Sequence, residues 1–122
     1  MLIKKALVVD DSSIARKMMI RSILTHRTVD ICEAVDGVDA VAKFKEFEPD
    51  VIFMDLTMPN MDGVQAQREI RKINKDIIIV ICSADIQGKM RDIVTEDGAF
   101  AIVKKPVDKD ELENVILRLE TL

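Results

Sequence analysis

Short apolar runs recur along the chain, and the spaces between them are long enough for one helix each. Three runs cover residues 6–9, 51–54 and 77–82, and each is rich in β-branched residues and too short for a helix. Weaker runs cover residues 29–34 and 100–103. Nearly continuous runs, rather than alternating ones, are typical of parallel strands that are covered on both faces. The pattern therefore predicts a buried parallel sheet of five strands.

Amphipathic segments between these runs predict the helices that cover the sheet. Apolar positions at helical spacing mark residues 14–24, 38–47 and 64–73. Residues 86–95 are mostly polar and include Gly88, so we expect the least stable helix there. Asp108, followed by Glu111, predicts the N-terminal cap of a last helix that runs to the C-terminus. The alternation predicts one doubly wound α/β domain over residues 1–122, with right-handed crossovers.

Composition narrows the classes of partner. With 48% hydrophobic and 33% charged residues, the chain has the composition of a soluble globular domain. A net charge of -4 gives no electrostatic support for binding nucleic acid or an anionic membrane, and no apolar stretch approaches the ~20 residues of a membrane span. Cys32 and Cys82 lie far apart in apolar stretches, so we interpret both as reduced core residues of a cytoplasmic protein.

Polar side chains follow four of the predicted strands. Asp10 and Asp11 follow the first strand, Asp55 the third and Ser83 the fourth, while the fifth runs into Lys105. The carboxyl ends of parallel strands meet at one edge of a sheet, which is where open α/β sheets bind ligands. Any one of the acidic residues could instead cap the helix that follows it. A single carboxylate directly after residues 51–54 would, however, be costly to bury, so the whole set favours a binding site.

Three converging carboxylates need positive charge. Each pair of unit charges repels by about 4 kcal/mol at ~4 Å and an effective dielectric near 20. Lys105 offsets one charge, and the remaining two suit a hard divalent cation with oxygen ligands, for which Mg2+ is the natural candidate. Asp55 could then attack phosphorus to give an acyl phosphate, with Lys105 and the Ser83 hydroxyl stabilising the phosphoryl oxygens. This chemistry needs no histidine base, and we interpret His26, the only histidine, as a surface or cap residue.

These residues resemble the receiver domain of bacterial response regulators. The resemblance is carried by Asp10-Asp11, by the segment from Met54 to Gly63 around Asp55, by Ser83-Ala84 and by Lys105-Pro106. It covers the whole chain and is closest to stand-alone, chemotaxis-type regulators, or to a receiver excised from a larger protein. It implies a flavodoxin-like (βα)5 fold with strand order 2-1-3-4-5.

The resemblance also implies a mechanism. Asp10 or Asp11, Asp55 and the backbone carbonyl of Thr57 would hold Mg2+. Asp55 would accept the phosphoryl group from a histidine kinase or a phosphotransfer protein, and Ser83 and Lys105 would contact it. A downstream protein would then bind the face formed by the fourth helix, fifth strand and fifth helix. We expect a monomer before phosphorylation and leave open a dimer after it.

Some positions depart from the family pattern or are interpreted through it. The family usually carries an aromatic residue three positions before the Lys105 equivalent, and here that position is Ile102. Phe100, two residues earlier, is expected on the same face of the strand. Thr57 and Asp85 occupy places that modulate loss of the phosphoryl group in this family, and we hypothesise that the charge of Asp85 affects access to the site.

Other readings compete with this one. A haloacid-dehalogenase-type phosphohydrolase also uses an Asp after an apolar strand, but it requires a second Asp where this chain has Thr57. A flavin-binding module of the same topology needs a phosphate loop, whereas residues 10–13 are acidic. Arg16, Lys17 and Arg21 are interpreted as a solvated face, with contact to a kinase as the alternative.

Overall fold

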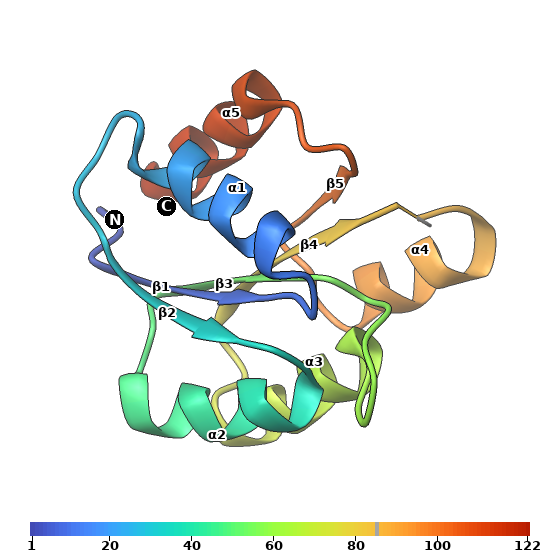
Figure 1. Ribbon diagram of the computed structural model, residues 1–122. Helices are drawn as coiled ribbons and strands as arrows, with labels where there is room; N and C mark the ends of the chain where they lie inside the picture. The colour runs from blue at the N-terminus through green and yellow to red at the C-terminus, as the bar shows by residue number, and fades with distance from the viewer. Residues whose placement is uncertain (85) are drawn as a thin grey trace.

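A parallel sheet separates two layers of helices in the computed structural model, which describes residues 1–84 and 86–122 (Figure 1). The strands are β1 (Lys5–Val9), β2 (Asp30–Ala34), β3 (Val51–Met54), β4 (Ile78–Ser83) and β5 (Ala101–Lys104). Their order is β2-β1-β3-β4-β5, and every neighbouring pair is parallel. The predicted fold class and strand order are confirmed.

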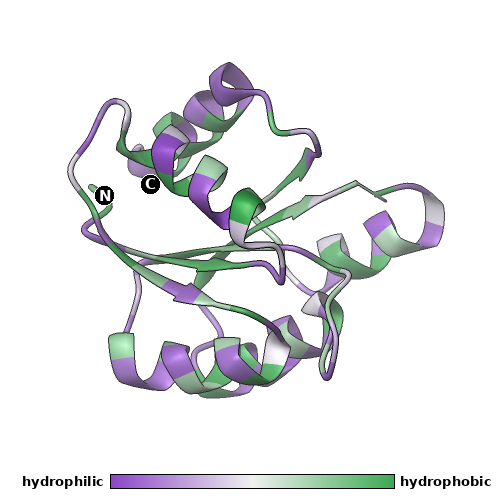
Figure 2. Cartoon of the chain, in the orientation of Figure 1, coloured by the Kyte–Doolittle hydropathy of each residue, from purple (hydrophilic) through white to green (hydrophobic). Residues whose placement is uncertain are grey.

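Five helices connect the strands. They are α1 (Ser13–Leu24), α2 (Gly37–Phe47), α3 (Gly63–Ile73), α4 (Gly88–Glu96) and α5 (Lys109–Glu120). Helices α1 and α5 lie on one face of the sheet, and α2 and α3 lie on the other (Figure 1). Hydropathy follows these layers, because the strands are mostly apolar and the helices carry polar stripes on their outer sides (Figure 2). None of the helices in the described part of the chain is long and apolar enough to span a bilayer.

The core has two parts, one on each face of the sheet. Alternate strand residues supply each part, as the pleat of a β-strand requires. On one face Val8 and Phe53 pack with Met19 and Ile23 of α1 and with residues 112, 115, 116 and 119 of α5. On the other face, apolar residues of β1, β3 and β4 pack with α2, α3 and Val94 of α4. The continuous apolar runs of the sequence are thus explained by burial on both sides.

Helix caps account for some of the acidic residues at the edge of the sheet. The Asp36 side chain accepts a hydrogen bond from the backbone N–H of Asp39, and Asp62 accepts one from Gln65. Asp108 accepts from the N–H groups of Asp110 and Glu111, as the sequence predicts. Each cap satisfies a backbone donor that the first turn of a helix leaves unpaired.

Helix α4 begins later than the sequence predicts. It starts at Gly88 rather than Ile86, and Gln87 before it makes no side-chain cap hydrogen bond. Gly88 has a φ of 57°, a left-handed conformation that favours glycine and interrupts a right-handed helix. Val94 is the buried residue of this helix. The low stability expected for α4 remains a prediction.

An ion pair ties α1 to α5 across the end of the first helix. Arg27 Nη1 donates to Glu113 Oε1 at 2.8 Å and to the Ile23 carbonyl at 3.1 Å, and Nη2 pairs with the other oxygen of Glu113. The hydrogen bonds from Arg27 lower the pKa of Glu113 by more than its partial burial raises it. The charged form of Glu113 is therefore favoured in the folded protein.

Glu113→Gln should lower the free energy of unfolding by about 1–3 kcal/mol at neutral pH, because a charge-assisted pair is lost. The contribution of Glu113 is complete above the ordinary glutamate pKa of 4.5, and it disappears as the pH falls through the lower pKa of the folded state. Urea unfolding of both proteins at neutral and acidic pH measures this. Glu46→Gln, at an exposed position, is the control. An equal deficit at both pH values would contradict the assignment.

Candidate functional site

The polar residues predicted to converge do meet at the carboxyl edge of the sheet. The backbone N–H of Asp10 donates to the Ala34 carbonyl at 3.1 Å, and that of Asp55 donates to the Val9 carbonyl at 3.0 Å. The N–H of Lys105 donates to the Ser83 carbonyl at 3.0 Å. Each of these residues thus extends the strand ladder by one position, and its backbone is fixed by the sheet.

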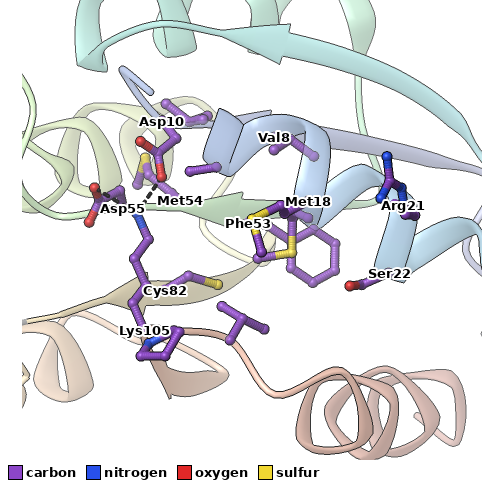
Figure 3. A pocket seen from close by; sticks show the side chains of 15 residues that line it. Val8, Asp10, Met18, Arg21, Ser22, Phe53, Met54, Asp55, Cys82 and Lys105 are labelled. Carbon is purple, nitrogen blue, oxygen red and sulfur yellow. Dashed lines mark hydrogen bonds and ion pairs between the residues drawn. The ribbon is translucent and has the colours of Figure 1, made fainter. Parts of the chain in front are cut away.

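Their side chains form a compact charged cluster. One carboxylate oxygen from each of Asp10, Asp11 and Asp55 lies within 4.8 Å of the others. Lys105 Nζ reaches between two of them, donating to Asp10 Oδ2 and to Asp55 Oδ2, the latter at 3.2 Å (Figure 3). Asp10 and Asp55 are 6% and 8% exposed, whereas Asp11 is exposed to solvent. Three carboxylates and one ammonium leave two negative charges, as the sequence predicts.

The ammonium of Lys105 is held in its charged form. Burial alone lowers the pKa of Lys105, but the hydrogen bond to Asp10 and the charges of Asp55 and Asp10 outweigh burial and raise it. Lys105 is therefore a fixed cation at neutral pH and not a proton donor. Its role in the cluster is charge balance.

The backbone orients the Asp55 carboxylate. Its Oδ1 accepts the N–H of Leu56 at 2.8 Å, while Oδ2 faces Lys105. Gly63 packs against this turn, and its N–H donates to the Leu56 carbonyl at 2.8 Å. A Cβ atom at position 63 would lie 2.2 Å from the carbonyl oxygen of Asp55, so no side chain fits there without movement. The close approach explains a glycine directly after Asp62.

The other predicted site residues surround this cluster. Ser83 is the last residue of β4 and is 2% exposed. Thr57 lies two residues after Asp55 on the exposed surface of the β3–α3 loop, residues 55–62. The proposed roles of the Ser83 hydroxyl and the Thr57 carbonyl stay predictions. Asp85 lies outside the described residues.

Sequence reasoning misjudged Arg16. Its side chain is only 14% exposed rather than solvated. Nη1 donates to the carbonyl of Asp10 at 2.7 Å, and Nε pairs with Glu33 Oε1 at 2.9 Å. Arg16 therefore braces the backbone of Asp10 from α1. The sequence does place Arg16 in the first turn of the helix that follows residues 10–12, and this closeness could have suggested the contact with Asp10.

Phe100 and Ile102 pack on opposite sides of the sheet, which corrects the prediction that they share a face. Phe100 packs with the α1 and α5 part of the core, and the guanidinium carbon of Arg118 lies 5.5 Å from its ring centroid. Ile102 packs with the α2 and α3 part. The reason is that β5 begins at Ala101, so the strand alternation does not extend back to Phe100. Phe100 thus does not take the place of the missing aromatic residue.

A cavity of about 260 Å³ lies beneath α1, beside the charged cluster (Figure 3). Its walls are largely apolar, and Val8, Phe53 and Cys82 come from three neighbouring strands. Burial raises the pKa of the Cys82 thiol to about 12, so the sulfur stays protonated and is a poor nucleophile. Both cysteines are free, with Cys82 buried and Cys32 only half-buried.

The donor set fits a hard divalent cation. The clustered ligands are all carboxylate oxygens, with no thiolate or imidazole among them. Oxygen ligands of this kind suit Mg2+ or Ca2+ better than Zn2+, which usually takes thiolate or imidazole ligands as well. Mg2+ usually keeps several of its waters and binds one or two carboxylates together with a phosphate oxygen of the substrate. The cluster has few carboxylates and Asp11 is exposed at its rim, so it leaves room for these other ligands.

Known proteins resemble this chain in sequence over most of its length. The sequence model of the response regulator receiver domain matches residues 6–117. The chain is 40% identical to the chemotaxis protein CheY of Thermotoga maritima over 104 residues, covering 84% of this chain and 86% of that one. It is 39% identical to CheY of Bacillus subtilis, covering 92% and 93%.

Solved structures show the same arrangement of elements. The CheX–CheY–BeF3–Mg2+ complex from Borrelia burgdorferi matches with a TM-score of 0.91 and 26% identity, covering 97% of this chain and 90% of that one. The response regulator domain of Thermotoga maritima CheB matches with a TM-score of 0.88 and 26% identity, covering 98% of each. The comparisons give no support to the phosphohydrolase alternative.

Proposed function

The chain belongs to the response regulator receiver domain family, whose members are phosphorylation-dependent switches of two-component systems, and on this premise we propose that Asp55 is its phosphate acceptor. The observation that carries the proposal is the position of Lys105 Nζ between Asp10 and Asp55. Of these carboxylates, Asp55 is the one at the end of the central strand β3.

The proposed reaction is an in-line displacement at phosphorus. An oxygen of Asp55 forms a bond to phosphorus as the phosphorus–nitrogen bond of a phosphohistidine breaks, and the departing imidazole keeps the bonding pair and takes a proton. Lys105 is already charged and stays close to the acceptor oxygen, so it can stabilise the negative charge of the transferred group. The Ser83 hydroxyl, at the end of the adjacent strand β4, is proposed to donate to a phosphoryl oxygen. No general base is required, because a carboxylate is the nucleophile.

Asp10, Asp11, Asp55 and the Thr57 carbonyl are the proposed ligands of Mg2+. When bound, Mg2+ neutralises phosphoryl oxygens and the remaining charge of the cluster. Arg16 supports this arrangement by holding the backbone of Asp10. We propose that the chain catalyses its own phosphorylation and dephosphorylation only.

The proposed partners are proteins. A histidine kinase or phosphotransfer protein would supply the phosphoryl group, and a downstream protein would bind the face formed by α4, β5 and α5. The Borrelia CheY structure contains CheX together with BeF3 and Mg2+, which supports a protein partner for the activated state here. Free thiols at positions 32 and 82 support a cytoplasmic location. We propose a monomer in the unphosphorylated state.

Incubation with a small phosphodonor should give a single phosphate adduct in the presence of Mg2+ and very little with a chelator. The reason is that Lys105 alone leaves two negative charges at the acceptor, and these would repel the incoming anion. Intact mass spectrometry measures the adduct over time. Equal adduct formation with and without Mg2+ would overturn the metal-dependent mechanism.

A further inference from the structure

Two loops at the carboxyl edge of the sheet are fastened to each other. Asn60 Nδ2 donates to Asp36 Oδ2 at 2.7 Å, and the backbone N–H of Gly37 donates to the Met61 carbonyl at 2.9 Å. Asn60 lies in the β3–α3 loop that follows Asp55, and Asp36 directly precedes α2. These hydrogen bonds therefore join the loop after the phosphate acceptor to the first turn of another helix.

Asp36 is a fixed acceptor in this arrangement. Its Oδ1 caps α2 by accepting the N–H of Asp39 at 2.8 Å, which leaves Oδ2 for Asn60. The side chain is buried, and the two hydrogen bonds hold the pKa of Asp36 below its ordinary value. A charged acceptor makes both hydrogen bonds stronger than a neutral one would. Because α2 holds Asp36, the loop must conform to the helix.

Asn60 is matched to its position by backbone and side chain together. Its φ is 66°, in the left-handed region that asparagine tolerates better than most residues. Glycine could adopt the same backbone conformation but could not donate to Asp36. Within the described segment 56–61, Asn60 carries the only side chain with a hydrogen bond to another part of the chain.

Thr57, whose carbonyl is a proposed Mg2+ ligand, lies in the β3–α3 loop between residues that are held in place. Leu56 and Met58 on either side of it are buried in the core, and the loop is then held again at Asn60 and Met61. Thr57 itself is exposed, so its own side chain does little to fix its backbone. The conformation at Thr57 is thus set by its neighbours and by the attachment to α2.

We propose that Asp36 and Asn60, here called the latch, are positioning residues for the Mg2+ site. The latch holds the β3–α3 loop in the conformation from which the Thr57 carbonyl binds the ion, and this inference rests on the proposed function. Neither latch residue belongs to the carboxylate cluster, so both act through the loop. Outer groups that orient metal ligands commonly contribute tenfold or more to metal affinity, and a loop ordered beforehand loses less freedom when it binds.

Asn60→Gly is the sharpest variant, because it removes the hydrogen bond and keeps the left-handed backbone. We expect its Mg2+ dissociation constant to rise about tenfold, measured by amide chemical shifts of residues 10–12 during a Mg2+ titration. At saturating Mg2+ its rate of phosphorylation should return close to that of the wild type, because Asp55 and Lys105 are untouched. A weakened metal affinity with a recovered rate separates positioning from chemistry.

Asn74→Gly is the matched control. It removes an exposed asparagine with one side-chain hydrogen bond, to the N–H of Asp76, at the other end of α3. Its Mg2+ affinity should equal that of the wild type. The double variant Asp36→Ala with Asn60→Gly should bind Mg2+ no more weakly than Asp36→Ala alone, because the second change removes a bond already lost.

The outcomes distinguish the latch from the function on which it rests. A wild type that binds no Mg2+ would overturn both proposals. If the wild type binds Mg2+ and Asn60→Gly binds it equally well, only the latch is overturned. This holds even if Asn60→Gly has a lower Tm than the wild type when both are unfolded without Mg2+. If the losses of Mg2+ affinity in Asp36→Ala and Asn60→Gly add up in the double variant, the latch is also overturned. If Asn60→Gly is unstable at the temperature of the titration, all the proteins are titrated at a lower temperature, and the same comparison is made there.

Discussion

Asp55→Asn is expected to abolish the phosphate adduct completely. The amide cannot act as the nucleophile at phosphorus, although it fills the same space and can still accept the N–H of Leu56. The fold should persist, because the change removes one of three like charges from a crowded cluster. Intact mass after incubation with phosphodonor and Mg2+ measures the result.

Asp62→Asn is the matched control for Asp55→Asn. Asp62 lies in the same loop, is exposed and caps α3, a role that asparagine fills as well as aspartate. Its adduct should form at the rate of the wild type. A persistent adduct on Asp55→Asn at another residue would refute the assignment of the acceptor.

Lys105→Met should slow phosphorylation by about 10²–10³-fold, the loss typical of removing one preorganised group that stabilises transition-state charge. Methionine keeps the length and apolar stem of the side chain but leaves Asp10 and Asp55 without their ammonium partner. The site then carries one more negative charge, so Mg2+ should bind at least as tightly as in the wild type. This pattern is the reverse of that expected for Asn60→Gly, and the same mass and titration measurements separate the two.

The control for Lys105 is its neighbour. Lys104 is exposed at the end of β5, and its Nζ makes no hydrogen bond or ion pair within the described residues. The phosphate adduct should therefore form on Lys104→Met at the rate of the wild type. A normal rate in Lys105→Met as well would refute the charge-stabilising role. Loss of Mg2+ binding in Lys105→Met would contradict the charge balance on which the site was predicted.

Local patterns were sufficient for the fold because the three central strands, β1, β3 and β4, are almost entirely buried on both faces. Each apolar run became a strand within one residue at either end, and the spacing left no room for anything but one helix between strands. The start of α4 was less predictable. Ile86 fits a helical pattern, but it is buried ahead of the helix, and the left-handed Gly88 sets the boundary.

The charged cluster could also be predicted, because parallel strands bring their carboxyl ends together. What sequence could not settle was which acidic residues cap helices and which face one another. Asp36, Asp62 and Asp108 are caps, whereas Asp10 and Asp55 share Lys105. That division depends on side-chain directions after each strand, which a single sequence does not reveal.

Contacts between separate loops and helices could not be predicted from local sequence patterns. Asn60 and Asp36 are 24 residues apart, and nothing in either segment marks the other as its partner. Arg16 was misjudged for the same reason, since a helical arginine is usually solvated unless a carbonyl such as that of Asp10 lies within reach. Phe100 was placed on the wrong face because one residue decides where a strand begins.

The two glycines at the edge of the sheet restrict how this sequence can drift. A Cβ at position 37 would lie 2.4 Å from the Met61 carbonyl oxygen, and one at position 63 would lie 2.2 Å from that of Asp55. Even alanine at either place would push the acceptor loop outward. Descendants of this chain can therefore vary their exposed helix surfaces, and with them their partners, far more freely than these two positions.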